Sequence, residues 1–136
     1  MKMYDLIEHT ADVGIKAYGK NLAEAFEHAA VAMFDIITDH SKIETIGEYD
    51  ITLEAPDLEQ LLVDWLSELL FLNGAKNLVF GKFEVTLQGT RLSAKAYGEE
   101  YSLKKHKMGE EIKAVTYHML EVHAEKPYFV QVLFDI

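Results

Sequence analysis

The C-terminal stretch of the sequence constrains the fold most strongly. Residues 128–136 alternate in the manner of a β-strand, which is stable only when it pairs with a neighbour. Chain ends usually fray because nothing buried holds them, so a strand here predicts that this end is held in a sheet. A second strand-like run begins at Val13, directly after Asp12. If the two runs pair, the side chains of Asp12 and Asp135 and the main-chain carboxylate of Ile136 converge.

Three carboxylates in one place would form a set of hard oxygen ligands. Proteins bind Ca²⁺ and Mg²⁺ through such oxygens. The sequence therefore predicts a divalent-cation site, with Ca²⁺ as the first candidate and Mg²⁺ or Mn²⁺ as alternatives. Other roles fit the same residues: Asp12 could cap a turn, and Asp135 could be an exposed strand end. Acidic residues are depleted in strands, however, so the position of Asp135 indicates a partner.

The predicted elements indicate a single α+β domain over residues 1–136. Apolar side chains at helical spacing predict helices over 22–37, from residue 58 to Asn73-Gly74, and from Glu110-Glu111 to a break at Lys126-Pro127. Strands are predicted at 3–8, 13–18, 48–54, 78–87, 91–97 and 128–136. Hairpins combined with single-helix crossovers predict a mixed β-sheet with about three helices packed against it, a two-layer α/β sandwich.

The composition disfavours or excludes several classes of function. The net charge is −10 and Arg91 is the only arginine, whereas proteins that neutralise phosphates need clustered basic side chains. The basic cluster at 104–107 is interpreted as a solvated loop. There is no cysteine, which excludes a disulfide framework and a thiolate zinc site. The apolar runs are too short for a membrane helix and the N-terminus lacks an export signal, so we expect a cytoplasmic protein without tight nucleic-acid binding.

Several segments of the chain together resemble the archease family. They are Glu8-His9-Thr10-Ala11-Asp12, Ala17-Tyr18-Gly19, Ala25-Phe26, Ala32-Met33-Phe34, Gly98-Glu99-Glu100, Glu111-Ile112-Lys113-Ala114-Val115-Thr116-Tyr117 and Phe134-Asp135-Ile136. The pieces follow one another in the family's order with similar spacing. The resemblance therefore covers essentially the whole chain.

The resemblance implies a small, non-enzymatic activator of another enzyme. That enzyme is the GTP-dependent RNA ligase of tRNA splicing, which joins exon halves ending in a 3′-phosphate or 2′,3′-cyclic phosphate. The ligase's own histidine becomes guanylylated, and an archease assists this step and allows multiple turnover. The resemblance also implies a chaperone-like association with tRNA cytosine methyltransferases. The family's functional residues match Asp12, Lys113 and Asp135, with the Ile136 carboxylate as a third calcium ligand.

Three further residues have more than one interpretation. Lys113 lies near the start of the predicted third helix. It could be a solvated lysine on the polar face, or a cation directed at the acidic site or at a bound phosphate. Glu99 lies at the edge of the site or, as we favour, in a charged loop. His9 is expected to hydrogen-bond beside the site instead of ligating, because imidazole suits softer metals than Ca²⁺.

Two other functions compete with that of an activator. A small metal-dependent hydrolase could use the same carboxylates to hold Mg²⁺ and activate water, but the sequence shows no general base with a supporting group. A general chaperone would need a large exposed apolar patch, whereas the predicted helix faces and sheet account for the apolar residues.

Overall fold

The structure of the protein is a computed structural model that describes residues 2–9 and 12–136, with only the backbone described for Glu8 and His9. In chain order the elements are β1 (Tyr4–His9), β2 (Asp12–Gly19), α1 (Leu22–Ile37), a 3-10 turn η1 (His40–Lys42), β3 (Gly47–Glu54), α2 (Leu58–Lys76), β4 (Leu78–Gln88), β5 (Arg91–Glu100), β6 (Ala114–Val115), β7 (Glu121–His123) and β8 (Tyr128–Asp135).

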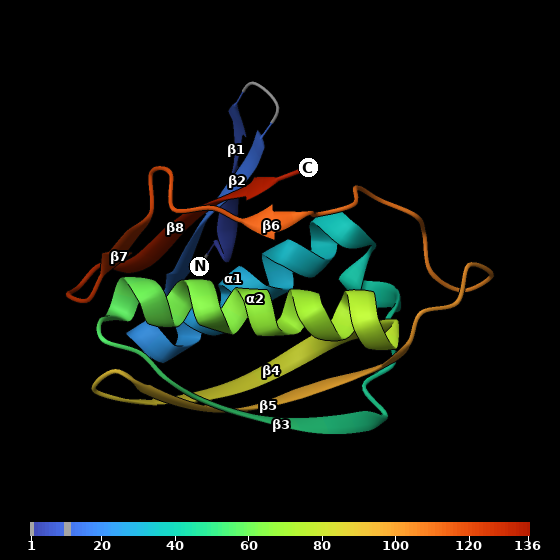
Figure 1. The fold of residues 1–136 in the computed structure, drawn as a ribbon, viewed down its shortest axis with the longest axis horizontal. Coiled ribbons are helices and arrows are strands. Elements are labelled where there is room, and N and C mark those ends of the chain that lie inside the picture. The colour runs from blue at the N-terminus through green and yellow to red at the C-terminus, as the bar shows by residue number, and fades with distance from the viewer. Residues whose placement is uncertain (1, 10–11) are drawn as a thin grey trace.

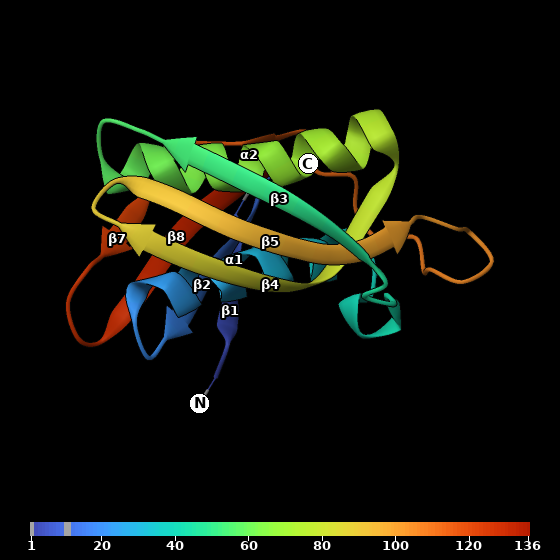
Figure 2. The same ribbon diagram turned by 90° about the horizontal axis from the view of Figure 1, so that it is seen from below.

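The strands form two sheets, and the helices lie between them (Figure 1 and Figure 2). One sheet has the order β1-β2-β8-β6, with β7 also paired to β8, and the other has the order β3-β5-β4. Helix α1 contacts β2 and β8 on one side and β4 on the other. Every strand pairing is antiparallel. The predicted α+β class is thus confirmed, but the single mixed sheet is wrong, because β3 pairs with β5 instead of joining the strands of the N-terminal hairpin.

Side-chain caps begin both helices where the sequence predicts them. The Asn21 side chain accepts a hydrogen bond from the N–H of Glu24 (2.8 Å), and the Asp57 side chain accepts one from Gln60 (2.7 Å). Helix α1 has the predicted bounds, but α2 runs to Lys76, past the predicted stop. It ends there because Asn77 adopts a left-handed conformation with φ 57°, which asparagine tolerates.

The predicted third helix is wrong, so the described structure contains two helices instead of three. The segment 110–123 is mostly without regular structure, and two short parts of it, β6 and β7, pair with β8. Its apolar side chains have helical spacing, but the backbone bonds to β8: the N–H of Thr116 donates to the carbonyl of Leu133 at 2.9 Å. Met119 has φ 57°, which no helix accommodates. Tertiary pairing therefore overrides local periodicity here.

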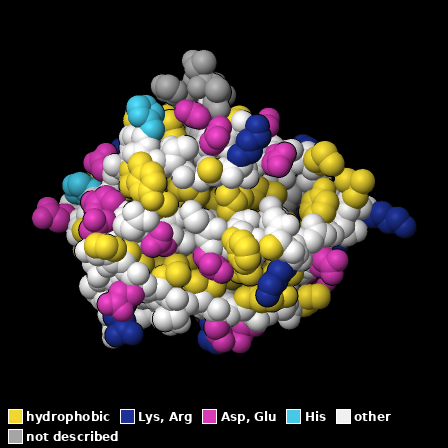
Figure 3. Space-filling view, in the orientation of Figure 1, with side chains coloured by type: hydrophobic (Ala, Val, Ile, Leu, Met, Phe, Trp, Pro, Cys, Tyr) yellow, Lys and Arg dark blue, Asp and Glu magenta, His cyan; other side chains and the backbone are white. Residues whose placement is uncertain are grey.

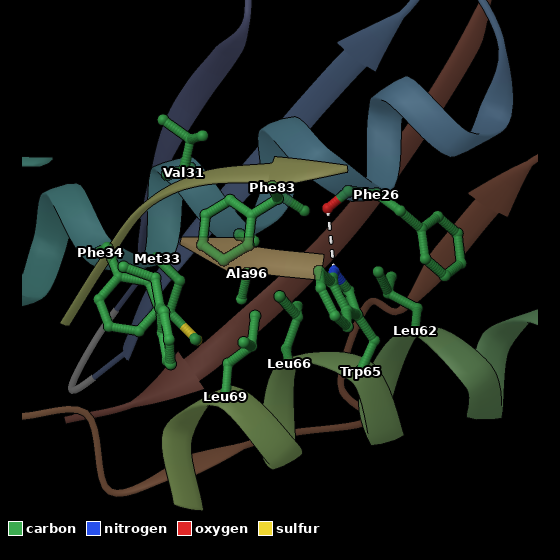
Figure 4. Packing of buried hydrophobic residues seen from close by; sticks show 14 of the residues in the cluster. Phe26, Val31, Met33, Phe34, Leu62, Trp65, Leu66, Leu69, Phe83 and Ala96 are labelled. Atoms are coloured by element: carbon green, nitrogen blue, oxygen red, sulfur yellow. Dashed lines mark hydrogen bonds between the residues drawn. The ribbon is translucent and has the colours of Figure 1, made fainter. Parts of the chain in front are cut away.

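Aromatic side chains fill the core between the helices and the three-stranded sheet (Figure 4). Trp65 of α2 packs edge-on against Phe83 of β4 with ring centroids 5.9 Å apart, and Phe34 of α1 does the same with Phe80 at 5.6 Å. The buried indole N–H of Trp65 donates to the carbonyl of Phe26 at 3.1 Å, which ties α2 to α1. The two helices are thereby packed firmly against the three-stranded sheet β3-β5-β4.

Candidate functional site

Asp12 and Asp135 lie directly opposite each other where β2 and β8 meet. Side chains of directly opposed residues point to the same face of an antiparallel sheet, with Cβ atoms about 4.5–5.5 Å apart. The next pair is Val13 and Phe134, and Phe134 is fully buried in the core. Because faces alternate along a strand, the two carboxylates project from the opposite face, away from the helices. The predicted pairing of the two strands is thus confirmed, and the aspartates are neighbours.

Lys113 and Ile136 flank Asp135. The N–H of Lys113 donates to the carbonyl of Asp135 at 2.7 Å, and Ala114 is the residue opposite Asp135 on β6. Lys113 is exposed, whereas its neighbour Ile112 is only 6% exposed and anchors the segment in the core. The half-buried side chain of Ile136 packs against the same core. The end of β8 is therefore held on both sides, by β2 and by β6 (Figure 1).

The aspartate pair brings two carboxylates to one face of the sheet. Like charges directly opposite each other on neighbouring strands are destabilising. Asp135 is exposed and Asp12 is half-buried, so both can be reached from solvent. Their carboxylate oxygens are hard ligands of the kind that Ca²⁺, Mg²⁺ and Mn²⁺ accept. The oxygen donors of the two aspartates fit a hard divalent cation.

His9 and Glu99 have different relations to this pair. The backbone of His9 is opposite Asp12 in the β1–β2 register, and its side chain lies outside the described part of the structure. Glu99 lies near the end of β5, in the sheet on the other side of the helices (Figure 1 and Figure 2). The predictions that Glu99 borders the site or lies in a charged loop are both wrong, because hairpin pairing extends β5 to Glu100.

The carboxylate of Glu99 is the centre of a satisfied polar cluster. It accepts hydrogen bonds from the ammonium of Lys105 (2.8 Å), Nε2 of His106 (2.9 Å) and the N–H of Glu44 (2.8 Å). Nδ1 of the buried His106 accepts from the N–H of Ser102 at 2.8 Å, so the ring proton is on Nε2. Burial would raise the pKa of Glu99, but these hydrogen bonds outweigh it and lower the pKa to about 2. We call these groups the Glu99 cluster.

A further titratable cluster lies at the C-terminal end of α1 and the start of η1, and sequence reasoning did not identify it. Ligand atoms of Asp35, Asp39 and His40 lie within 4.8 Å of one another. Asp35 already accepts hydrogen bonds from the hydroxyl of Tyr4 (2.7 Å) and from Nδ1 of His40 (2.5 Å). Burial and the bond to Asp35 raise the pKa of Tyr4 to about 12. The sequence gives no clear signal, because the cluster depends on the turn η1 and on a tyrosine from β1.

A groove runs between the C-terminal half of α2 and the segment that leads into β6. Its volume is about 570 Å³. We call it the α2 groove, and it is lined by Ile37, Ser67, Leu70, Phe71, Asn73, Gly74, Glu110, Glu111, Ile112, Lys113, Ala114 and Val115. Lys113 thus borders both the groove and the end of β8. The groove could not be predicted from the sequence. One of its walls is the segment 110–115, which the sequence pattern assigns to a helix.

Comparisons with known proteins match this architecture. The model of the Archease protein family (MTH1598/TM1083) matches residues 4–136. The chain belongs to the archease family. Protein archease of Pyrococcus furiosus is 46% identical over 126 residues, which cover 90% of this chain and 89% of that protein. Protein archease of Sulfolobus acidocaldarius is 43% identical, with both chains covered completely.

A solved structure extends the family match to the fold. The solution structure of protein 1598 of Methanobacterium thermoautotrophicum superposes with a TM-score of 0.86, at 38% identity and with 100% of both chains covered. The arrangement of helices between sheets is thus the archease arrangement. In the described part of this family member, neither helix is long and apolar enough to cross a membrane.

Proposed function

We propose that this archease family member activates the GTP-dependent RNA ligase of tRNA splicing. It would assist guanylylation of the ligase's own histidine and allow multiple turnover, without catalysing a reaction itself. Family membership supports this role. The observation that carries it is the placement of Asp12, Asp135 and Lys113 at one end of a rigid sheet.

The acidic pair would hold a divalent cation, with Ca²⁺ as the first candidate. The ligands would be the side chains of Asp12 and Asp135 and the main-chain carboxylate of Ile136. A bound cation would supply positive charge to a nucleotide phosphate or a ligase carboxylate. The packed core beneath Phe134 and Ile136 holds the ligands in place before the ligase binds. Phosphoryl and nucleotidyl transfer depend on such preorganised charge more than on covalent help from the protein.

Lys113 would add a second positive group beside the acidic pair. Its ammonium is a compact point charge on a flexible stem, suited to a phosphate or to an acidic side chain of the ligase. Because Ile112 is buried and the N–H of Lys113 is bonded to Asp135, the stem starts from a fixed position. Contacts to tRNA would come from the ligase, since a net charge of −10 opposes phosphate binding by this chain.

A turnover assay tests the proposal directly. Substoichiometric protein should raise both guanylylation and product formation by a GTP-dependent RNA ligase that otherwise stalls after about one turnover. Asp12→Ala, Asp135→Ala and Lys113→Ala should each abolish the effect. Glu121→Ala is a matched control, since it removes an exposed carboxylate on β7 that lies opposite Gln131, four residues before Asp135 along β8. Full activation by the three site variants would show that these residues do not act in it.

Two further results would change the proposal. Hydrolysis of a nucleotide or phosphoester by the purified chain, abolished by Asp12→Ala, would favour the metal-dependent hydrolase instead. Extra residues placed after Ile136 would move the main-chain carboxylate away from the site and should weaken metal binding and activation more than thermal stability. Equal activity of the extended and unextended proteins would remove that carboxylate from the ligand set.

A further inference from the structure

The α2 groove has an apolar floor that is open to solvent. Phe71 is 60% exposed, and Leu70 beside it is half-buried. Ile112 forms part of the opposite wall. Met108, 70% exposed, lies in an adjoining depression that shares Ile37 and the two wall glutamates with the groove. Figure 3 shows that apolar side chains gather on the face that carries α2, with acidic side chains among them. The groove thus offers apolar area that this chain itself does not cover.

The wall of the groove is acidic. Glu110 and Glu111 are both exposed and line the groove together. Lys113 is the one basic side chain of the lining, and the chain as a whole carries a net charge of −10. Such a wall repels phosphates and attracts basic side chains. The charge therefore favours a protein segment with Lys or Arg over RNA as the occupant.

One backbone segment, residues 109–113, connects the groove with the acidic pair. The N–H groups of Gly109 and Glu110 donate to the carbonyls of Ile37 and Ile36 (2.9 Å each), which fixes the start of the wall to α1. A Cβ at Gly109 would lie 2.3 Å from the Ile36 oxygen, so this close approach requires glycine. The wall then runs through Ile112 to Lys113, whose N–H donates to the carbonyl of Asp135. A segment bound in the groove would consequently lie at a fixed position relative to the metal ligands.

We infer that the α2 groove docks a segment of the activated ligase that carries both apolar and basic side chains. This inference rests on the proposed function. Phe71 supplies the aromatic anchor that such interfaces use, and Glu110 and Glu111 supply the charge that selects and orients the segment. Docking here brings the acidic pair and Lys113 to the ligase in one orientation. The groove sets affinity, whereas the end of β8 sets the rate of the activated reaction.

Titration of ligase turnover with increasing amounts of this protein separates these two roles. Phe71→Ala should raise the half-maximal activating concentration by about tenfold and leave the maximal turnover unchanged. Glu110→Gln combined with Glu111→Gln should raise that concentration less and weaken its dependence on salt. Ile46→Ala is the matched control: this side chain is 77% exposed but lies outside the groove, and its removal should change neither quantity.

A measurement of the affinity for the ligase separates failure of the docking site from failure of the proposed function. Fluorescence anisotropy of labelled protein with the ligase should show the same loss of affinity for Phe71→Ala, whether or not turnover responds. If the wild-type protein binds through Phe71 without activating, the proposed function fails and the docking site stands. Unchanged affinity in both the Phe71 and the double glutamate variants overturns the docking site. Light scattering that shows a dimer dissociated by Phe71→Ala would assign the groove to a second copy and also overturn it.

Discussion

The Glu99 cluster and the Asp12–Asp135 pair are both built around carboxylates, but the surroundings of these carboxylates differ. The carboxylate of Glu99 is 11% exposed and accepts hydrogen bonds from Lys105, His106 and a backbone N–H. Asp135 is exposed, and the residue opposite it is another aspartate. In the cluster the protein supplies the balancing charge. At the pair it sets two like charges beside each other.

This contrast separates a structural acid from an acid that is available to a ligand. Hydrogen bonds to a charged carboxylate stabilise the fold when every partner is in place, as they are around Glu99. Like charges directly opposite each other on neighbouring strands are destabilising. In the proposed function, a bound cation would offset this repulsion between Asp12 and Asp135. Removing the charge of Asp135 and that of Glu99 in separate variants tests this difference.

Asp135→Asn should have the largest effect of these variants, and this effect should be on Ca²⁺ binding and ligase activation without a loss of stability. It should lower the affinity for Ca²⁺ by at least about tenfold and abolish ligase activation. The free energy of unfolding should change by less than about 0.5 kcal/mol, because an exposed carboxylate facing a like charge contributes little to stability. Calorimetric titration and urea denaturation measure the two quantities. A large loss of stability would show that the pair is structural after all.

Added Ca²⁺ should stabilise the wild-type protein. A ligand that binds only the folded state adds about 2.7 kcal/mol at a concentration of 100 Kd. Thermal unfolding should therefore shift upward with Ca²⁺ in the wild-type protein and shift clearly less in Asp135→Asn. Equal shifts in both proteins would place the cation elsewhere, and the group formed by Asp35, Asp39 and His40 would be the next region to test.

Glu99→Gln should show the opposite pattern to Asp135→Asn. Loss of the charge weakens the hydrogen bonds from Lys105 and His106, and should lower the free energy of unfolding by about 1–3 kcal/mol at pH 7. Ligase activation should persist at temperatures where the variant is folded. Urea denaturation and the turnover assay measure the two effects. Activation lost without loss of stability would contradict the assignment of Glu99 to a structural cluster.

The stabilising effect of Glu99 should disappear in acid. Its pKa is about 2 in the folded protein against an ordinary value of 4.5. A lowered pKa means that the unfolded chain binds the proton first, so the contribution is complete above pH 4.5 and falls as the pH drops toward 2. The difference in unfolding free energy between wild type and Glu99→Gln should shrink over that interval. A difference that stays constant with pH would show that packing, and not charge, carries the effect.

Much of the fold could be predicted from local sequence signals. Caps at Asn21 and Asp57 located both helix starts, and the turn between 88 and 91 located the β4–β5 hairpin. Alternation at the end of the chain predicted β8, and its pairing with β2 was a hypothesis that the structure confirms. Long-range partners could not be predicted in this way. The segment 110–123 has helical spacing, yet its backbone forms two short strands that pair with β8.

The candidate site shows the same division. Asp12 and Asp135 could be predicted as neighbours because each lies at the end of a recognisable strand. Lys113 could be identified only by family resemblance, since the local pattern assigned it to the wrong structure. Glu99 was misplaced because β5 extends past the predicted strand end, and its partners Lys105 and His106 could not be predicted because no spacing rule connects them to it. Clusters built across loops depend on tertiary structure that local patterns do not contain.

The position of β8 in its sheet couples the site to the order of synthesis. Every other strand of that sheet precedes β8 in the chain, yet β8 lies between β2 on one side and β6 and β7 on the other. A nascent chain that has not yet released β8 from the ribosome holds Asp12 without Asp135. The strands beside the gap also lack their common hydrogen-bonding partner until then. If the proposed site acts through Asp12 and Asp135 together, metal and ligase binding would require that β8 has first joined its sheet between β2 and β6.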